Sequence, residues 1–293
     1  QNGEIYKESY DKLILSPGAM PIKPPLPGLD SNKVFTLRTI PDTLRLKSYI
    51  DSKKAKKAVV VGGGFIGLEI AENLINDSLS VTLVEKMPHV LPTIDEDVAW
   101  DVHDYLIKCG IDLRCNTELV KVVDKDEGID VVTSNDTIHA DLVVLAIGIR
   151  PESKLAIEAG IACNERGYII VDSAMRSSVD DIYAIGDVVA VKEFVTGTSA
   201  SIALAGPANK QGRIVADQIC GIDSRYQGSQ GSNVIKLFEK TLASTGITER
   251  FAKSQGIDCE KVHLYLSNHA SYYPGAEFMA IKIIFEKGTG RIL

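Results

Sequence analysis

Apolar residues follow two different spacings along this chain, and each spacing predicts a different element. The unbroken, β-branched-rich run at 58–61 is typical of a strand buried in a parallel sheet. The apolar stripe that follows it, as far as Leu74, has the spacing of a helix. A second short run from Ser80 to Val84 predicts the next strand. Strand, helix and strand in this order predict a βαβ unit.

Three glycines, Gly62, Gly64 and Gly67, lie where this first strand turns into the helix, and they fit a dinucleotide-binding turn. Gly62 would permit the tight turn, Gly64 would let the backbone approach a pyrophosphate, and Gly67 would let the helix pack closely on the strand. The phosphates would then meet the unpaired N–H groups at the helix N-terminus. A glycine turn with only a packing role is the alternative, and the register of strand, helix and second strand argues against it.

An acidic residue completes the pattern. Glu85 follows the second strand at the distance where an acid hydrogen-bonds the ribose 2′-OH of an adenosine. A carboxylate at this place would repel a 2′-phosphate, so Glu85 favours NADH over NADPH. Lys86, directly beside it, keeps NADPH as an alternative.

The rest of the chain continues the alternation of strands and helices. Before residue 149 we expect, in order, a strand leading into a glycine turn at 10–19, a proline-rich crossover at 21–28, and a short strand and a helix from Pro41. After the βαβ unit we expect a helix at 95–108, a strand at 111–115, and strand-like stretches at 118–123, 128–134 and 137–148. Beyond residue 149 we expect a helix at 151–160, strands within 167–189, a long helix from Ala205, a linker at 226–232, and then strand, helix, strand and a hairpin around 287–290. The pattern predicts an α/β fold.

Composition narrows the class of protein further. The net charge of -7 and the scattered lysines argue against a nucleic-acid surface. No apolar run is long enough to span a membrane, and the first residues do not resemble a signal peptide, so we expect a cytoplasmic protein without a membrane partner. The chain has no initiator Met and begins in what resembles a strand of an existing domain, so we expect a fragment.

The cysteines do not form a metal-binding or disulfide pattern. Their number is odd, no C-x-x-C pair occurs, and no zinc-like spacing is present, so we predict no metal site and reduced, structural thiols. The five are Cys109, Cys115, Cys163, Cys220 and Cys259.

A second motif, DDIYAIGDVV at 180–189, brings an apolar strand to a carboxylate at Asp187. Ligands of α/β sheets bind at the carboxyl ends of strands, although an aspartate at such a place also caps ordinary turns. With LAIGIRP at 145–151, YDKLILSPGA at 10–19 and the glycine turn, the chain resembles the FAD- and NAD(P)-dependent pyridine nucleotide-disulfide oxidoreductases over essentially its whole length.

The resemblance implies residues that would hold FAD. Gly186 and Asp187 match the family's second FAD motif, so Asp187 would accept a hydrogen bond from the flavin ribityl chain. The segment LAGPANKQGR is similar to the helix that points its N-terminus at the flavin pyrimidine, which would place Ala205 and Asn209 beside the isoalloxazine. A helix N-terminus there would stabilise the negative charge of reduced flavin.

The resemblance also implies residues on the nicotinamide side. Gly148, at the end of LAIG, and Ile66 and Glu69, on the helix after the glycine turn, match positions near the nicotinamide. Phe65 matches an aromatic residue that can cover the flavin until NADH enters, although a core ring is an equally good interpretation.

The C-terminal segment of the sequence indicates a branch of the family. NHASYYPGAEFMAIKIIF, from residue 268, is similar to the interface domain of CoA-disulfide reductases. In these homodimers a tyrosine of the segment reaches the partner's active site, which would make Tyr273, or else Tyr272, a proton donor for a thiolate leaving group. Two interface aromatics with packing value alone are the alternative.

The resemblance predicts the domain organisation and the function together. We expect two Rossmann-like nucleotide-binding domains, with an incomplete FAD domain at 1–30 and 151–225, an NAD(P) domain at 31–150, and a truncated α+β dimerisation domain at 230–293. The first FAD loop and the redox cysteine of the family are absent from this sequence, so none of its cysteines is the expected nucleophile.

We expect the complete protein to pass hydride from NAD(P)H through FAD to a cysteine-based centre that reduces CoA disulfide, CoA persulfide or polysulfide. The alternatives are an NADH oxidase or peroxidase of the same fold, a reductase that serves an iron–sulfur or dioxygenase partner, and, for the fragment alone, a non-catalytic NADH-binding module.

Overall fold

The structure, a computed structural model, describes residues 3 and 5–293, so positions 1, 2 and 4 of the predicted segment 1–30 lie outside the described residues. The chain divides into two compact units. The first comprises Gln1–Met20 and Ile149–Asn233, and the second comprises Pro21–Gly148 and Val234–Leu293. Each unit has a hydrophobic core of its own.

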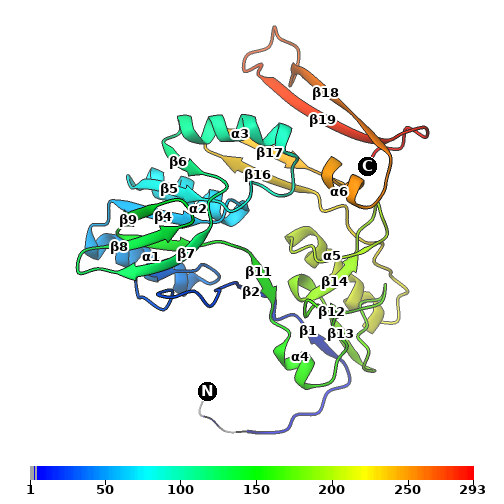
Figure 1. Cartoon of the computed structure of the whole chain (residues 1–293). Helices are drawn as coiled ribbons and strands as arrows, with labels where there is room; N and C mark the ends of the chain where they lie inside the picture. The colour runs from blue at the N-terminus through cyan, green and yellow to red at the C-terminus, as the bar shows by residue number, and fades with distance from the viewer. Residues whose placement is uncertain (1–2, 4) are drawn as a thin grey trace. The chain divides into compact units, whose positions relative to one another are not determined.

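A five-stranded parallel sheet forms the centre of the second unit (Figure 1). Its strands, in spatial order, are β3 (Val34–Phe35), β10 (Leu142–Leu145), β4 (Lys57–Val61), β5 (Ser80–Val84) and β6 (Ile111–Arg114). The helices that follow β3, β4 and β5 are α1 (Ile40–Lys53), α2 (Phe65–Asn76) and α3 (Glu96–Lys108). The sheet and its helices confirm the predicted α/β class.

Alternate residues of the central strand β4 face two different layers. Val60 packs in a cluster with α1, α2 and α3, whereas Val59 and Val61 pack in a second cluster with an antiparallel meander. The meander consists of β7 (Leu119–Asp124), β8 (Ile129–Thr133) and β9 (Thr137–Ala140). Because both faces of β4 are buried, its sequence is a continuous apolar run.

The stretch 137–148, which the sequence predicts as one strand, forms two. It leaves the meander after Ala140 and enters the parallel sheet as β10, and Asp141 lies at the change. The Asp141 carboxylate accepts hydrogen bonds from the N–H groups of Lys56 and Lys57, at 2.6 and 2.8 Å. These bonds attach Asp141 to the start of β4. The chain therefore changes direction at Asp141, and β9 and β10 are separate strands.

The first unit holds short strands around one long helix. The strand pairs are β1 (Leu13–Leu15) with β13 (Ile182–Ala184), β2 (Ala19–Pro21) with β11 (Ile149–Pro151), and β14 (Val189–Lys192) with both β12 (Ile169–Ile170) and β15 (Ser199–Ala200). The helices are α4 (Lys154–Glu158), the 3₁₀ turn η1 (Gly186–Val188) and α5 (Ala205–Ile219). Helix α4 is shorter than the predicted 151–160 because Pro151 pairs within β11.

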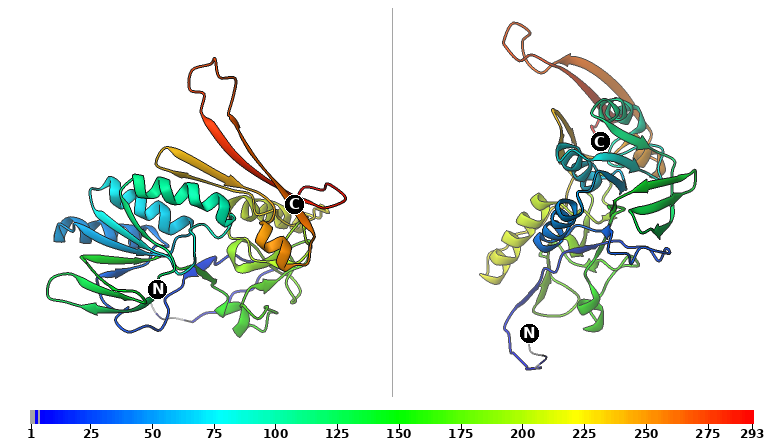
Figure 2. Two further views of the ribbon diagram at one scale, coloured as in Figure 1. Left: turned by 45° about the horizontal axis from the view of Figure 1, so that its top comes forward. Right: turned by 90° about the vertical axis from the view of Figure 1, so that its left-hand side faces the viewer.

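The C-terminal part consists of two hairpins and a short helix. Its elements are β16 (Asn233–Leu237), β17 (Lys240–Ser244), α6 (Glu249–Ser254), β18 (Cys259–Ser267) and β19 (Phe278–Glu286). The loop between β18 and β19 stands clear of the rest of the second unit in both views of Figure 2. Among the described residues, no helix combines the length and the apolar character that crossing a membrane requires.

Candidate functional site

The turn after β4 has a geometry that only glycine permits. Gly62 has φ +111°, and a Cβ atom on it would lie 2.3 Å from the carbonyl oxygen of Ala146. A Cβ atom on Gly67 would lie 1.9 Å from the carbonyl oxygen of Gly62. Gly62 therefore lets the turn approach the backbone that follows β10, and Gly67 lets α2 pack closely against the turn at the end of β4.

The N-terminus of α2 is open for an anion. Gly64 is its N-cap residue, no side chain caps the first turn, and no acidic residue lies in that turn. A Cβ atom on Gly64 would meet nothing within 4 Å. The first N–H groups of α2 and the free space at Gly64 together form the kind of cradle that binds a pyrophosphate.

Glu85 joins the glycine turn to the segment after β5. Its Oε2 accepts a hydrogen bond from the Gly63 N–H at 2.6 Å, and its Oε1 accepts one from the Met87 N–H at 2.7 Å. A carboxylate oxygen accepts more than one hydrogen bond, so a ribose hydroxyl remains a compatible donor. The Glu85 side chain thus holds the turn in place, and its role at the ribose stays a prediction. The spacing of the glycine motif does not predict the hydrogen bonds of Glu85 to Gly63 and Met87.

Lys86 is paired with an acid of its own. Its Nζ lies 2.6 Å from Oε1 of Glu118, and both side chains are exposed. The predicted ribose end of the site therefore has Glu85, Lys86 and Glu118, with an excess of one negative charge. This balance favours a cofactor without a 2′-phosphate.

A buried histidine, which the sequence analysis missed, holds the segment that follows Lys86. The Val90 N–H donates to Nε2 of His103 at 3.2 Å, and the Leu91 N–H donates to the carbonyl oxygen of Gly63 at 2.8 Å. Burial, with a smaller effect of the neighbouring His89, lowers the pKa of His103. A neutral His103 is required because its Nε2 must accept the hydrogen bond.

Cys115 packs beside this histidine. Its Sγ lies 3.9 Å from Nε2 of His103. Burial and then the charge of Glu85 raise the pKa of Cys115 to about 11, so at neutral pH it is a thiol and a poor nucleophile. All five cysteines are unpaired in the structure.

The residues predicted for the nicotinamide side all lie in the second unit. Ile66 and Glu69 are exposed on α2, whereas Phe65 is half-buried and packs against the core. Gly148 has φ +119°, and its carbonyl oxygen accepts a hydrogen bond from the Ile22 N–H at 3.0 Å. The contacts of Phe65 are those of a core ring, and the roles of all four residues toward a nicotinamide stay predictions.

The residues predicted for FAD lie in the first unit. Strand β13 leads into Gly186, which has φ +79°, and Asp187 follows in η1. The Gly186 N–H donates to Oε1 of Gln211 at 2.7 Å, and Gln211 is only 1% exposed. Gln211 therefore fixes the turn that presents Asp187, although nothing in the sequence distinguishes it.

Helix α5 begins without a side-chain cap. Its N-cap residue is Leu204, which offers no oxygen to the first N–H groups, and Ala205 and Asn209 are exposed one turn apart on the helix. An uncapped N-terminus beside an exposed helix face fits a group that accumulates negative charge. The predicted FAD residues are thus compatible with the flavin.

The two predicted tyrosines lie on the loop between β18 and β19. Tyr272 is 82% exposed and Tyr273 is 60% exposed. Their ring centroids are 4.9 Å apart, and His269 approaches the Tyr273 ring edge-on at 6.4 Å. The tyrosines are available to a partner or a substrate.

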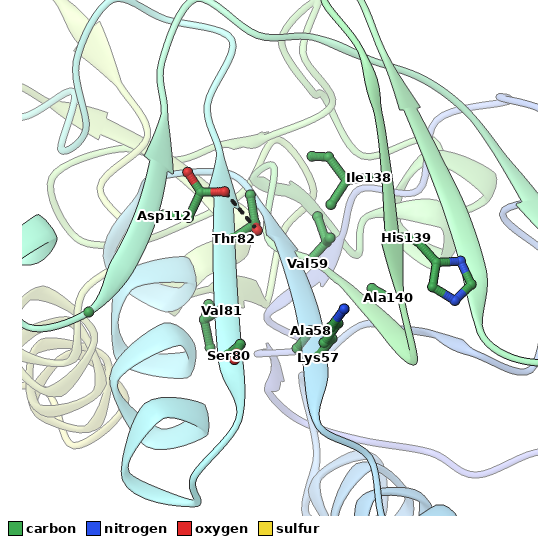
Figure 3. Close-up of a pocket in the computed structure, with 11 residues that line it drawn as sticks. Lys57, Ala58, Val59, Ser80, Val81, Thr82, Asp112, Ile138, His139 and Ala140 are labelled. Carbon is green, nitrogen blue, oxygen red and sulfur yellow. Dashed lines mark hydrogen bonds between the residues drawn. The ribbon is translucent and has the colours of Figure 1, made fainter.

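The second unit also has a cavity of about 300 Å³ (Figure 3). It is lined by the first residues of β4 and β5, by Asp112 of β6 and by β9, whereas the turn follows the last residue of β4. The Thr82 hydroxyl donates to Asp112 across its wall at 3.1 Å. Since dinucleotides bind at the carboxyl ends of strands, this cavity is not the dinucleotide site.

Comparison with known proteins identifies relatives of the whole chain. The family model for pyridine nucleotide-disulphide oxidoreductases matches residues 1–212. The coenzyme A disulfide reductase of Staphylococcus haemolyticus is 34% identical over 296 residues, which cover 100% of this chain and 65% of that protein.

Two solved structures share the fold closely. Reduced Bacillus anthracis CoADR-RHD superimposes with a TM-score of 0.95 at 45% identity, over 99% of this chain and 52% of that one. The water-forming NADH oxidase from Lactobacillus brevis, bound to NADH, superimposes with a TM-score of 0.93 at 33% identity, over 100% of this chain and 64% of that one. The chain therefore spans less than two thirds of the length of each of these three proteins.

Proposed function

Because the chain belongs to the pyridine nucleotide-disulphide oxidoreductase family, we propose that it is the NAD(P)H-binding region and part of the FAD-binding region of a flavoenzyme that cleaves a sulfur–sulfur bond. NADH is the favoured reductant and NADPH the alternative. The proposed acceptor is CoA disulfide, CoA persulfide or polysulfide.

The observation that carries this proposal is the open N-terminus of α2 behind a turn in which Gly62 and Gly67 admit no side chain. Gly62 and Gly67 bring the backbone together, and Gly64 leaves space for phosphate oxygens. Glu85 holds the same turn through Gly63 and offers a carboxylate at the end of β5. These features would bind the adenosine and pyrophosphate of NADH, while Gly148, Ile66 and Glu69 would border its nicotinamide.

FAD, when bound, supplies the transfer of electrons from hydride to the sulfur centre. The chain would hold the flavin with Asp187, presented by the Gly186 turn, and with the N-terminus of α5 near Ala205 and Asn209. The uncapped first turn of α5 supports this assignment, because its N–H groups would stabilise negative charge on the ring. We assign the redox cysteine to none of the five cysteines.

The sulfur substrate is proposed from the C-terminal loop and from the relatives. Tyr273, or Tyr272 beside it, would donate a proton to the departing thiolate. The names of the Staphylococcus haemolyticus and Bacillus anthracis proteins support a CoA-linked substrate. We further propose a cytoplasmic homodimer in which residues 230–293 form the interface, 31–150 bind NAD(P)H, and 1–30 with 151–225 bind FAD.

Anaerobic stopped-flow spectroscopy tests the proposal on the full-length, FAD-loaded enzyme. The flavin is reduced with NADH and then mixed with CoA disulfide or CoA persulfide, with oxygen or with hydrogen peroxide. Rapid reoxidation by the sulfur compounds and slow reoxidation by oxygen and peroxide are expected. The reverse order would refute the sulfur substrate.

An NADH oxidase is the second candidate, and the Lactobacillus brevis structure at a TM-score of 0.93 favours it specifically. The same experiment separates the two, since an oxidase reoxidises fastest with oxygen. A non-catalytic NADH-binding module is the candidate for the chain by itself. A purified chain that is colourless and still binds NADH would support that candidate.

A further inference from the structure

Five charged residues form an ion cluster that joins four elements of the second unit. We call them the α3 ion cluster: Asp95 and Asp97 at the start of α3, Glu249 of α6, Lys261 of β18 and Lys282 of β19. Lys261 bridges Asp97 and Glu249 at 3.1 and 2.7 Å. The cluster connects α3 with the β18–β19 hairpin, which carries Tyr272 and Tyr273.

Lys282 is the centre of this cluster. Its Nζ lies 2.9 Å from Asp95, 2.9 Å from Asp97 and 2.9 Å from Glu249, and its side chain is only 6% exposed. Burial opposes its charge, but the three carboxylates outweigh burial and raise the pKa of Lys282. Hydrogen bonds from Lys253, Lys261 and Lys282 hold the pKa of Glu249 far below its usual range. Both shifts favour the charged forms of Lys282 and Glu249 at neutral pH.

Asp95 shows that the cluster is built across elements and not within one helix. It occupies the N-cap position of α3, yet its side chain caps nothing in that helix. Its carboxylate instead accepts hydrogen bonds from the N–H groups of Glu249 at 2.9 Å and Arg250 at 3.2 Å, at the start of α6. The same carboxylate binds Lys282, so α3, α6 and β19 share one buried anion.

The half of the hairpin between Lys282 and the loop that carries the tyrosines has few other contacts in the described chain. Tyr265, Leu266, Phe278 and Met279, which lie between the cluster and the loop, are all exposed. An isolated two-stranded hairpin is only marginally stable in water. Lys282 lies four residues after Phe278, the first residue of β19, and four residues span about 14 Å along a strand. A tilt of about 5° at the cluster would displace the loop by roughly 1 Å over that distance.

We propose that Lys282 is a positioning residue for Tyr272 and Tyr273, because its buried ion pairs fix the direction in which β18 and β19 carry the loop. The inference rests on the proposed function, in which one of these tyrosines donates a proton. A displacement of about 1 Å at a proton donor costs on the order of 100-fold in rate. The binding of NADH and the reduction of the flavin by NADH do not depend on that tyrosine.

The test uses the full-length, FAD-loaded enzyme with the variants Lys282→Met and Lys282→Arg. Lys282→Met keeps much of the side-chain volume but removes the cation that Asp95, Asp97 and Glu249 share, so that Asp97 and Glu249 keep only their pairs with other side chains such as Lys261. Lys282→Arg keeps the charge. The matched control is Lys287→Met, at the end of the same hairpin, where Lys287 makes one exposed pair with Glu260 at 3.2 Å. Flavin reduction by NADH and kcat for CoA disulfide are measured separately.

For Lys282→Met we expect kcat for CoA disulfide to fall at least 10-fold, with flavin reduction by NADH within twofold of the wild type. Lys282→Arg should recover most of the loss, and Lys287→Met should behave as the wild type. Hydrogen exchange should accelerate in β18 and β19 of Lys282→Met but not in β4. If Lys282→Met does not fold, Asp97→Asn replaces it, since this variant removes one of the three carboxylates that pair with Lys282. It should lower kcat about threefold.

Wild-type kcat in both Lys282→Met and Asp97→Asn would overturn the positioning role. An equal fall of both half-reactions would also overturn it, since the residue would then act on the whole fold. A wild-type enzyme that reduces no sulfur substrate would instead refute the proposed function itself, and with it the reaction that this anchor serves.

Discussion

Replacing Gly62 with alanine tests the glycine turn most directly. At φ +111° an L-residue is strained, and a left-handed backbone costs about 1–2 kcal/mol. The added Cβ would lie 2.3 Å from the Ala146 carbonyl oxygen, and such overpacking costs about 1–3 kcal/mol. The free energy of unfolding should fall by roughly 2–5 kcal/mol, which for a unit of this size lowers Tm by on the order of 5–20 °C.

Gly64→Ala is the matched control for this change, because it adds the same methyl group two residues away. Gly64 has φ -79°, which alanine adopts freely, and its added Cβ meets nothing within 4 Å. The melting temperature should therefore be unchanged or slightly higher. The methyl group would occupy the space proposed for the pyrophosphate, so Kd for NADH should rise at least 10-fold.

Thermal unfolding followed by circular dichroism and NADH titration followed by fluorescence measure the two effects independently. A Gly62→Ala protein that melts with the wild type would refute the backbone argument. A Gly64→Ala protein that binds NADH with the wild-type Kd would show that the pyrophosphate does not approach α2 at this point.

Three further predictions concern the surroundings of the turn. Glu118→Gln releases Lys86 from its exposed ion pair, so Kd for NADPH should fall about two- to fivefold while Kd for NADH changes less than twofold; an unchanged NADPH to NADH ratio would exclude Lys86 from the 2′ position. Cys115, with a pKa of about 11, should be alkylated by iodoacetamide at pH 8 at least 10-fold more slowly than the exposed Cys220, and equal rates by mass spectrometry would contradict its burial. Because the folded-state pKa of His103 is lowered, its contribution to stability is complete above the unfolded pKa of about 6.5 and is lost as pH falls below it. Urea titrations at pH 5 and pH 8 should thus show a smaller pH dependence for His103→Gln than for the wild type.

Local patterns in the sequence determined the βαβ unit, its glycine turn and the family. The run at 58–61 and the stripe to Leu74 predict β4 and α2 because burial imposes a period on neighbouring residues. Gly62 and Gly67 were predictable because no other residue tolerates those backbone contacts. The resemblance drawn from Asp187 and the other motifs is confirmed by the family match.

Only the tertiary structure decided where the polar side chains are used. Asp95 occupies the N-cap position of α3, yet its carboxylate bonds to α6 and to Lys282, which are far away in sequence. Gln211 fixes the Gly186 turn and Glu85 binds the Gly63 N–H by the same kind of long-range contact. Hydrophobic period is a property of adjacent residues, whereas a hydrogen bond depends on which distant backbone group the fold brings within about 3 Å, and no spacing in the sequence encodes that.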